Sequence, residues 1–148
     1  LNYSTMIEQI SEAKSIRELQ MSLSQRKDLI STPVLTSLIH IEHIYSMFNY
    51  IESYRNSKAI KGSVIQKKRF CFVILRLYSP ATILFDEQLP KGLRKGIAKA
   101  INVNCLPSIS HYCDSVISYY KTYKDFREEL DYLYTEIMYH LEAEKIIS

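Results

Sequence analysis

Four basic side chains in the middle of the chain recur at spacings that place them on one face of a helix. These residues are Lys91, Arg94, Lys95 and Lys99. The other face of the same predicted helix carries an apolar stripe of Leu93, Ile97, Ala98 and Ile101. Cationic side chains on an exposed helix face neutralise the phosphates of a nucleic-acid backbone. We therefore predict that the four basic residues contact phosphates.

A second polar group follows after a short turn, at the start of the next predicted helix. Its outward residues are Ser108, Ser110 and His111, while Ile109, Val116 and Tyr120 point inward. In helix-turn-helix units the first helix crosses the phosphate backbone, and residues early in the second helix reach base edges in the major groove. We therefore predict that Ser108, Ser110 and His111 contact bases.

The segment Ile97–Val103, followed by Ser108–His111, resembles the helix-turn-helix regions of bacterial and phage regulators over roughly 30 residues. Two departures from the family pattern are visible. Asn102 stands where the family has a turn glycine, and asparagine also adopts the left-handed conformation. Ile109 comes one position later than the corresponding apolar residue, which lengthens the turn.

Three further stretches, Arg76–Pro80, Leu89–Arg94 and Tyr123–Arg127, resemble uncharacterised helical proteins of bacterial mobile elements. This resemblance implies a role connected with DNA. Together with the basic helix, it predicts a protein that binds double-stranded DNA, as a transcriptional regulator or a mobile-element accessory protein.

An alternative function is a non-enzymatic adaptor that binds other proteins through tyrosine-rich helices. The chain has twelve tyrosines and no tryptophan, and four of the tyrosines fall on one predicted helix, Tyr112, Tyr119, Tyr120 and Tyr123. Tyrosines anchor protein interfaces, but they also pack in a core with the hydroxyl at its edge. In that case the basic helix face is simply solvated.

The charge of the chain is concentrated in one segment. The net charge is +3, but residues 58–100 carry +8, while the preceding and following segments carry −1 and −4. Besides the predicted helix, the basic segment includes Lys61, Lys67, Lys68 and Arg69. Such localised positive charge favours an anionic polymer as partner, although it also serves solubility.

Residue patterns for catalysis and metal binding are absent. The chain has no glycine-flanked serine elbow, and its three glycines are isolated, so no glycine-rich phosphate loop can form. His40 and His43 flank Glu42 but have no evident third ligand, and Cys105, His111 and Cys113 lack the paired short spacing of zinc sites. We therefore predict no enzymatic activity, no metal and no cofactor.

The cysteines and the longest apolar run bear on the cellular compartment. Three cysteines make an odd number without a disulfide framework, which predicts free thiols in a reducing cytoplasm. The apolar run Phe70–Leu75 is far shorter than the roughly 20 residues that span a bilayer. We predict a cytoplasmic protein without a membrane-spanning segment.

Apolar periodicity predicts an all-α fold, a compact bundle of six to eight helices in a single domain over residues 1–148. A capping box, Thr5 to Glu8, begins one or two short helices, and Pro33 begins a helix that stops near residues 55–57. Further helices are expected over 63–77, 89–101, 107–123 and 126–141, with a short turn or helix over 79–84 and the helix-turn-helix-like pair at about 89–123. The run Phe70–Leu75 also fits a buried strand, but no second strand is available to pair with it.

The last predicted helix has an apolar stripe at spacings of three and four residues. The stripe consists of Phe126, Leu130, Leu133, Ile137 and Leu141. It is a candidate seam for a homodimer, although a stripe of this length also docks on the core of its own chain.

Overall fold

Every regular element in the computed structural model, which describes residues 5–55 and 60–148, is a helix. The predicted all-α class is confirmed, and the described residues form seven α-helices and one 3₁₀ helix. Two structural units are distinguished, residues 1–32 and residues 33–148. Among the described helices, none combines the length and the apolar character needed to cross a membrane.

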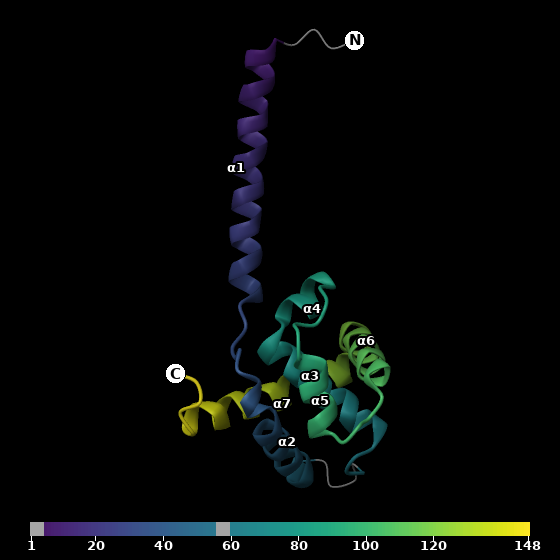
Figure 1. Ribbon diagram of the computed structural model, residues 1–148. Helices are drawn as coiled ribbons and strands as arrows, with labels where there is room; N and C mark the ends of the chain where they lie inside the picture. Colours follow the sequence, from purple (N-terminus) through teal and green to yellow (C-terminus); the bar gives the residue numbers. More distant parts are fainter. Residues whose placement is uncertain (1–4, 56–59) are drawn as a thin grey trace. The chain divides into compact units, whose positions relative to one another are not determined.

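The first unit consists of one long helix, α1, Met6–Ser31. Its start confirms the predicted capping box, because the Glu8 backbone N–H donates to Thr5 Oγ1 at 3.2 Å and the Thr5 N–H donates to Glu8 Oε2 at 3.1 Å. The helix continues without a break to Ser31, where one or two short helices were expected (Figure 1). None of its residues is buried.

The predicted helix start at Pro33 is wrong. Thr32 is extended, with a ψ of 122°, because a following proline disfavours the helical conformation. The N–H groups of Val34 and Leu35 then donate to the Leu77 carbonyl, at 2.8 and 3.1 Å, so this segment is held by a distant helix. A 3₁₀ helix, Leu38–His40, leads into α2, Ile41–Arg55. The helix ends at Arg55, and the expected stop residues Asn56 and Ser57 lie outside the described residues.

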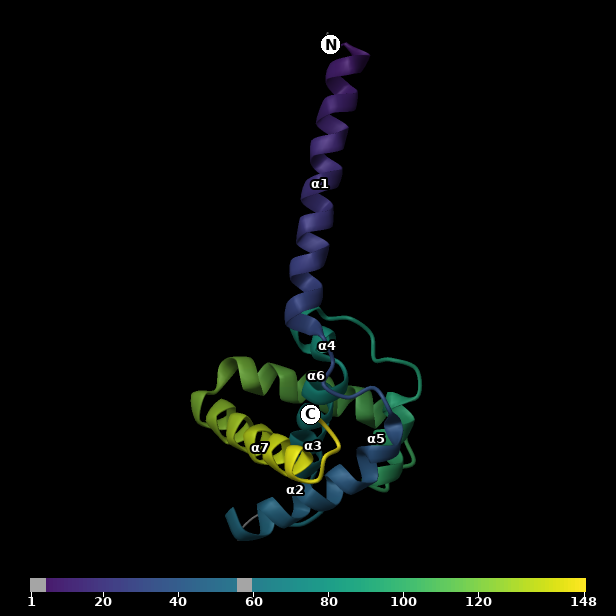
Figure 2. The same cartoon turned by 90° about the vertical axis from the view of Figure 1, so that its left-hand side faces the viewer.

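Helix α3, Val64–Tyr78, is the central element of the second unit. The Ser63 hydroxyl caps its start by accepting from the Gln66 N–H. The run Phe70–Leu75 lies within α3, which decides for the helix over the strand, and all six of its residues are buried. A helix that is apolar all round must be covered on every side. Helices α2, α4, α5, α6 and α7 all contact α3 (Figures 1 and 2).

The remaining helices follow the predicted order around α3. Pro80 opens the short helix α4, Pro80–Phe85, where a short turn or a helix was expected. Helix α5, Leu93–Ala100, begins a few residues later than predicted, because Pro90 and the following residues form a turn that closes on the Leu93 N–H. Helices α6, Leu106–Thr122, and α7, Lys124–Ala143, match the predicted ranges closely.

The apolar stripe of α7 faces the core of its own chain. Its fully buried members are Leu130, Leu133, Ile137 and Leu141, and Phe126 packs against the same core while partly exposed. These side chains are therefore not available as the seam of a homodimer, and the alternative interpretation of the stripe, docking within the chain, fits the structure.

Candidate nucleic-acid interface

Helix α5 and the residues next to its two ends separate apolar and basic side chains onto two faces. Leu93, Ile97, Ala98 and Ile101 are buried, and the four predicted phosphate contacts, Lys91, Arg94, Lys95 and Lys99, are all exposed. Helix α5 approaches the start of α2 closely at Gly96, because a Cβ there would lie 2.8 Å from Ile41 Cδ1 and the end of that side chain would have to shift. The buried stripe thus fixes α5 in place and leaves its basic face to solvent.

The turn between α5 and α6 ends α5 with a Schellman motif. Asn102 has a φ of 56°, the left-handed conformation expected for the residue in the place of the turn glycine. The Val103 N–H donates to the Ala98 carbonyl at 2.9 Å, and the Asn102 N–H to the Lys99 carbonyl at 3.4 Å. These bonds satisfy carbonyls that would otherwise be unpaired at the helix end. The turn then extends through Cys105, in keeping with the extra residue seen in the sequence.

The predicted base-contacting residues at the start of α6 differ in their exposure to solvent. His111 is exposed, while Ser108 and Ser110 are half-buried. The Ser108 hydroxyl bonds to the exposed Cys105 thiol, and this hydrogen bond lowers the pKa of Cys105 below its usual value of 9.0. Ser110 Oγ accepts from Arg94 Nη1 at 3.1 Å, so the structure brings a predicted phosphate contact and a predicted base reader into direct contact.

Lys99 is set apart from the other basic residues of α5. Its Nζ lies 3.7 Å from Glu42 Oε1 of α2, and both side chains are largely exposed. Exposed ion pairs of this kind contribute little to stability, so the contact leaves Lys99 able to exchange partners. None of the ion pairs of the described residues involves Lys91, Arg94 or Lys95.

A cleft of about 710 Å³ lies beside these three basic residues, between the segment after α4 and the start of α6. Its lining mixes the cations Lys91, Arg94 and Lys95 with the acids Asp86, Glu87 and Asp114. The carboxylates offset the positive charge inside the cleft and would repel a phosphate placed deep within it. The cationic surface that can accept phosphates is therefore the outer face of α5.

Part of the basic segment is used within the fold. Arg69 Nη1 lies 3.5 Å from Glu52 Oε2 in a largely buried pair, and the Lys68 ammonium lies 5.0 Å from the centre of the Tyr119 ring. Burial raises the pKa of Glu52 above 4.5, and the Arg69 guanidinium offsets part of that rise. Lys68 and Arg69 thus have structural partners, and less of the +8 charge is free for a ligand than the count suggests.

The tyrosines of α6 are also largely structural. Tyr120 stacks on Phe72 with ring centres 4.5 Å apart, and its hydroxyl donates to Asp131 Oδ1 at 2.6 Å. Arg76 donates to the same oxygen at 3.0 Å, which links α3, α6 and α7. Tyr123 remains exposed.

A different aromatic surface, on α2 and α7, is exposed and was not predicted. It consists of Tyr50, Tyr54, Tyr139 and His140, called here the aromatic patch. Tyr50 and Tyr139 are 64% and 67% exposed, respectively. The spacing of Tyr50 and Tyr54, four residues apart and off the buried stripe of α2, is a sequence signal for one half of the patch. The other half of the patch, Tyr139 and His140, comes from α7, and only the tertiary fold brings it next to Tyr50.

The remaining candidate metal ligands do not form a cluster among the described residues. His43 Nε2 lies 2.6 Å from Glu144 Oε2, and no group of three metal-binding side chains forms among the described residues. The cysteines are free, with Cys71 and Cys113 hydrogen-bonded to each other in the core. Their contact and their burial raise the pKa of Cys71 well above its usual value.

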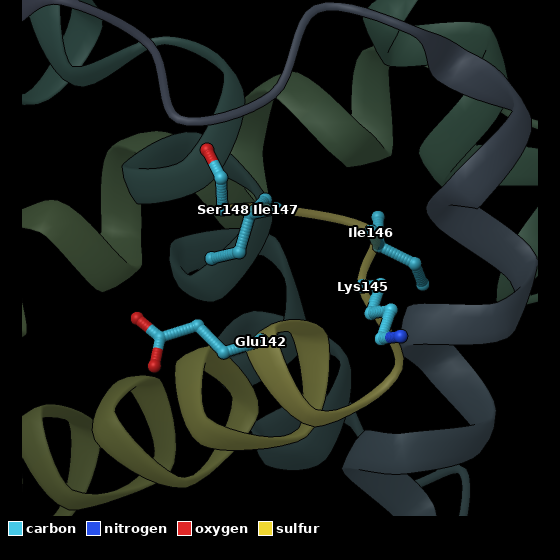
Figure 3. Close-up of a pocket in the computed structure, with 5 residues that line it drawn as sticks. All are labelled: Glu142, Lys145, Ile146, Ile147 and Ser148. Carbon is cyan, nitrogen blue, oxygen red and sulfur yellow. The ribbon is translucent and has the colours of Figure 1, made fainter.

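A second hollow, of about 620 Å³, lies at the C-terminal end of α7. Figure 3 shows the Glu142 carboxylate and the Lys145 ammonium pointing to opposite sides of it. The two charged groups do not converge on a common point, so the hollow has no evident ligand chemistry.

Comparisons of the chain with protein-family models, with curated proteins and with solved structures found no match.

Proposed function

We propose that residues 33–148 bind double-stranded DNA through the basic face of α5 and the start of α6, as a transcriptional regulator or a mobile-element accessory protein. The observation that carries this proposal is the exposed, unpaired cationic group of Lys91, Arg94 and Lys95. Three cations without carboxylate partners, Arg94 and Lys95 on a short helix and Lys91 in the turn before it, suit phosphates that are spaced regularly along a backbone.

The start of α5 adds backbone donors to this surface. Gly92, with a φ of 85°, precedes the helix and offers no side chain to cap it. The Leu93 N–H is bonded to the Pro90 carbonyl, which leaves the N–H groups of Arg94 and Lys95 for an anionic oxygen. The helix dipole also favours negative charge at this end. A phosphate placed here would meet backbone N–H groups and the adjacent Lys91, Arg94 and Lys95 side chains together.

The start of α6 supplies the polar side chains that such a complex would place near bases. His111 is exposed, and Ser110 is tied to Arg94, so a contact of Arg94 with phosphate would also orient Ser110. In this arrangement the side chains of α5 give affinity, while Ser110 and His111 give sequence preference.

The test is fluorescence-anisotropy titration of the whole chain with duplex DNA across a salt series, with the variant Arg94→Ala/Lys95→Ala beside the wild type. Each phosphate contact contributes about −0.9 to the slope of log affinity against log salt, so the variant should flatten the slope by about 2. The matched control is Lys121→Ala/Lys124→Ala, which removes the same charge from exposed positions outside α5. Absence of binding at low salt, or equal effects of the two variants, would refute the proposal.

A second function is favoured by the aromatic patch. Exposed tyrosines clustered on two packed helices are typical of surfaces that bind proteins, because a tyrosine offers large contact area at low entropic cost. The adaptor function then uses Tyr50, Tyr54 and Tyr139, and the basic face of α5 serves solubility. Failure of the DNA titration would make this patch the preferred interaction surface.

A further inference from the structure

Helix α1 exposes nine large apolar side chains, and four of them lie along one line of the helix, called here the apolar stripe of α1. Ile16, Leu19, Leu23 and Ile30 are each about half or more exposed, and none of the helix is buried. Their spacings of three, four and seven residues match the two apolar positions of a heptad, so they lie along one line of the helix. The stability of helices in proteins comes mostly from packing an apolar face, and a 26-residue helix with an uncovered stripe lacks that contribution.

Two charged residues lie within the same stripe. Ile16, Leu23 and Ile30 repeat every seven residues at one apolar position, and Glu12, Leu19 and Arg26 repeat every seven at the other. Glu12 is therefore in the acidic first half of the stripe and Arg26 in the basic second half, with Leu19 midway between them. None of the ion pairs of the described residues involves either side chain.

We propose that α1 binds the α1 helix of a second copy of this chain, in antiparallel orientation. A parallel pair in register would set Glu12 against Glu12 and Arg26 against Arg26 within an apolar seam, where like charges are costly. An antiparallel pair that brings Leu19 opposite Leu23 places Glu12 about one turn from Arg26 of the second copy. Antiparallel alignment also brings opposite ends of the two helix dipoles together.

This pairing is independent of the proposed DNA function, because it uses none of the residues of α5 or α6. The apolar residues that suggested a dimer seam on α7 are buried, whereas those of α1 are exposed. The occupant is specified by charge: in this register a second α1 places an arginine about one turn from each glutamate and a glutamate about one turn from each arginine.

The test is sedimentation equilibrium of the whole chain, whose monomer mass is 17.3 kDa. The wild type should associate to twice that mass. Glu12→Arg alone and Arg26→Glu alone each create like-charge contacts, so each should weaken association roughly tenfold or more. The double variant Glu12→Arg/Arg26→Glu restores opposite charges and should recover the wild-type affinity.

An equimolar mixture of the two single variants gives the sharpest result. One chain then carries two arginines and the other two glutamates, so the mixture should form a one-to-one dimer although neither variant self-associates well. Glu18→Arg is the matched control, because it makes the same charge change on the opposite face of α1 and should leave association unchanged.

Three outcomes would overturn the proposal. A wild type that stays monomeric at all concentrations would mean that α1 is covered by its own chain or by an unrelated partner. Single variants that dimerise as well as the wild type would assign association to another surface. A double variant or a mixture without recovery would exclude the antiparallel charge pairing, and circular dichroism of each variant would show that α1 is still helical.

Discussion

The buried side chain of Glu52 makes the stability of the fold depend on pH. It lies in the core beside Arg69, and the loss of hydration on burial raises its pKa above 4.5 more than the arginine lowers it. Its carboxylate therefore favours the proton more strongly in the folded chain than in the unfolded chain. The pair is well placed to join α2 to α3, but it does so at the cost of burying a charge.

We predict that Glu52→Gln changes the pH dependence of stability in a defined direction. Because the folded-state pKa is above the unfolded-state value, ionisation of Glu52 costs stability as the pH rises from about 4.5 through the raised pKa. The advantage of the wild type over Glu52→Gln should thus be largest at low pH and shrink across this window. Urea unfolding of both proteins from about pH 4 to about pH 8 measures the difference.

The exposed carboxylate of Glu128 provides the control for this experiment. Glu128→Gln should shift the free energy of unfolding much less than Glu52→Gln does, since ion pairs at exposed positions contribute little. A difference between wild type and Glu52→Gln that is constant over the whole pH range would contradict the role given to burial.

At the scale of elements, the turn between α5 and α6 depends on the left-handed conformation of Asn102. We predict that Asn102→Ala lowers the free energy of unfolding by about 1 kcal/mol, because a residue with a Cβ and no local hydrogen bond is strained there. Asn102→Gly should keep or raise the stability. Chemical denaturation of both variants checks this, with Asn104→Ala as the control from the same turn; equal stability of the alanine and glycine variants at 102 would contradict it.

Local sequence signals predicted most helix starts and stops, and a distant contact explains the misplaced start of α2. The capping box at Thr5, the proline at the start of α4 and the run Phe70–Leu75 act within one or two turns, so the sequence is sufficient to predict them. The start of α2 was misplaced because the N–H groups after Pro33 bond to Leu77, far away in the chain.

In the candidate site, too, local patterns could be predicted from the sequence, whereas contacts between distant helices could not. Helical periodicity predicted which residues of α5 are exposed and which are buried, and the structure agrees. It could not predict that Arg69 is paired with Glu52 or that Lys99 meets Glu42, because both partners come from α2. Whether the exposed cations bind DNA depends on a partner, and this stays a prediction.

At the scale of the whole molecule, the two proposals together imply binding through more than one site. Two chains joined through α1 would hold two basic α5 faces on one assembly, and linked sites bind a long polymer more tightly than a single site does. We predict that Glu12→Arg weakens binding to a long duplex by about tenfold or more, with no loss on a short duplex that accommodates one unit.

Weaker binding of Glu12→Arg to a long duplex would not follow from the charge change alone. Glu12→Arg adds positive charge to the chain, which by simple electrostatics would strengthen binding to DNA. Restoration of long-duplex binding in Glu12→Arg/Arg26→Glu would tie the effect to pairing of α1. Equal loss on long and short duplexes, measured by the same anisotropy titration, would contradict the link.

The three cysteines also give the chain a natural position for a spectroscopic reporter. Cys71 and Cys113 are enclosed in the core, whereas Cys105 is exposed and its pKa is lowered by Ser108. Thiol-reactive dyes attack the thiolate, so Cys105 should be labelled first in the folded protein. A fluorophore there sits at the turn between α5 and α6, and its emission would register a ligand arriving at this surface without any substitution in the chain.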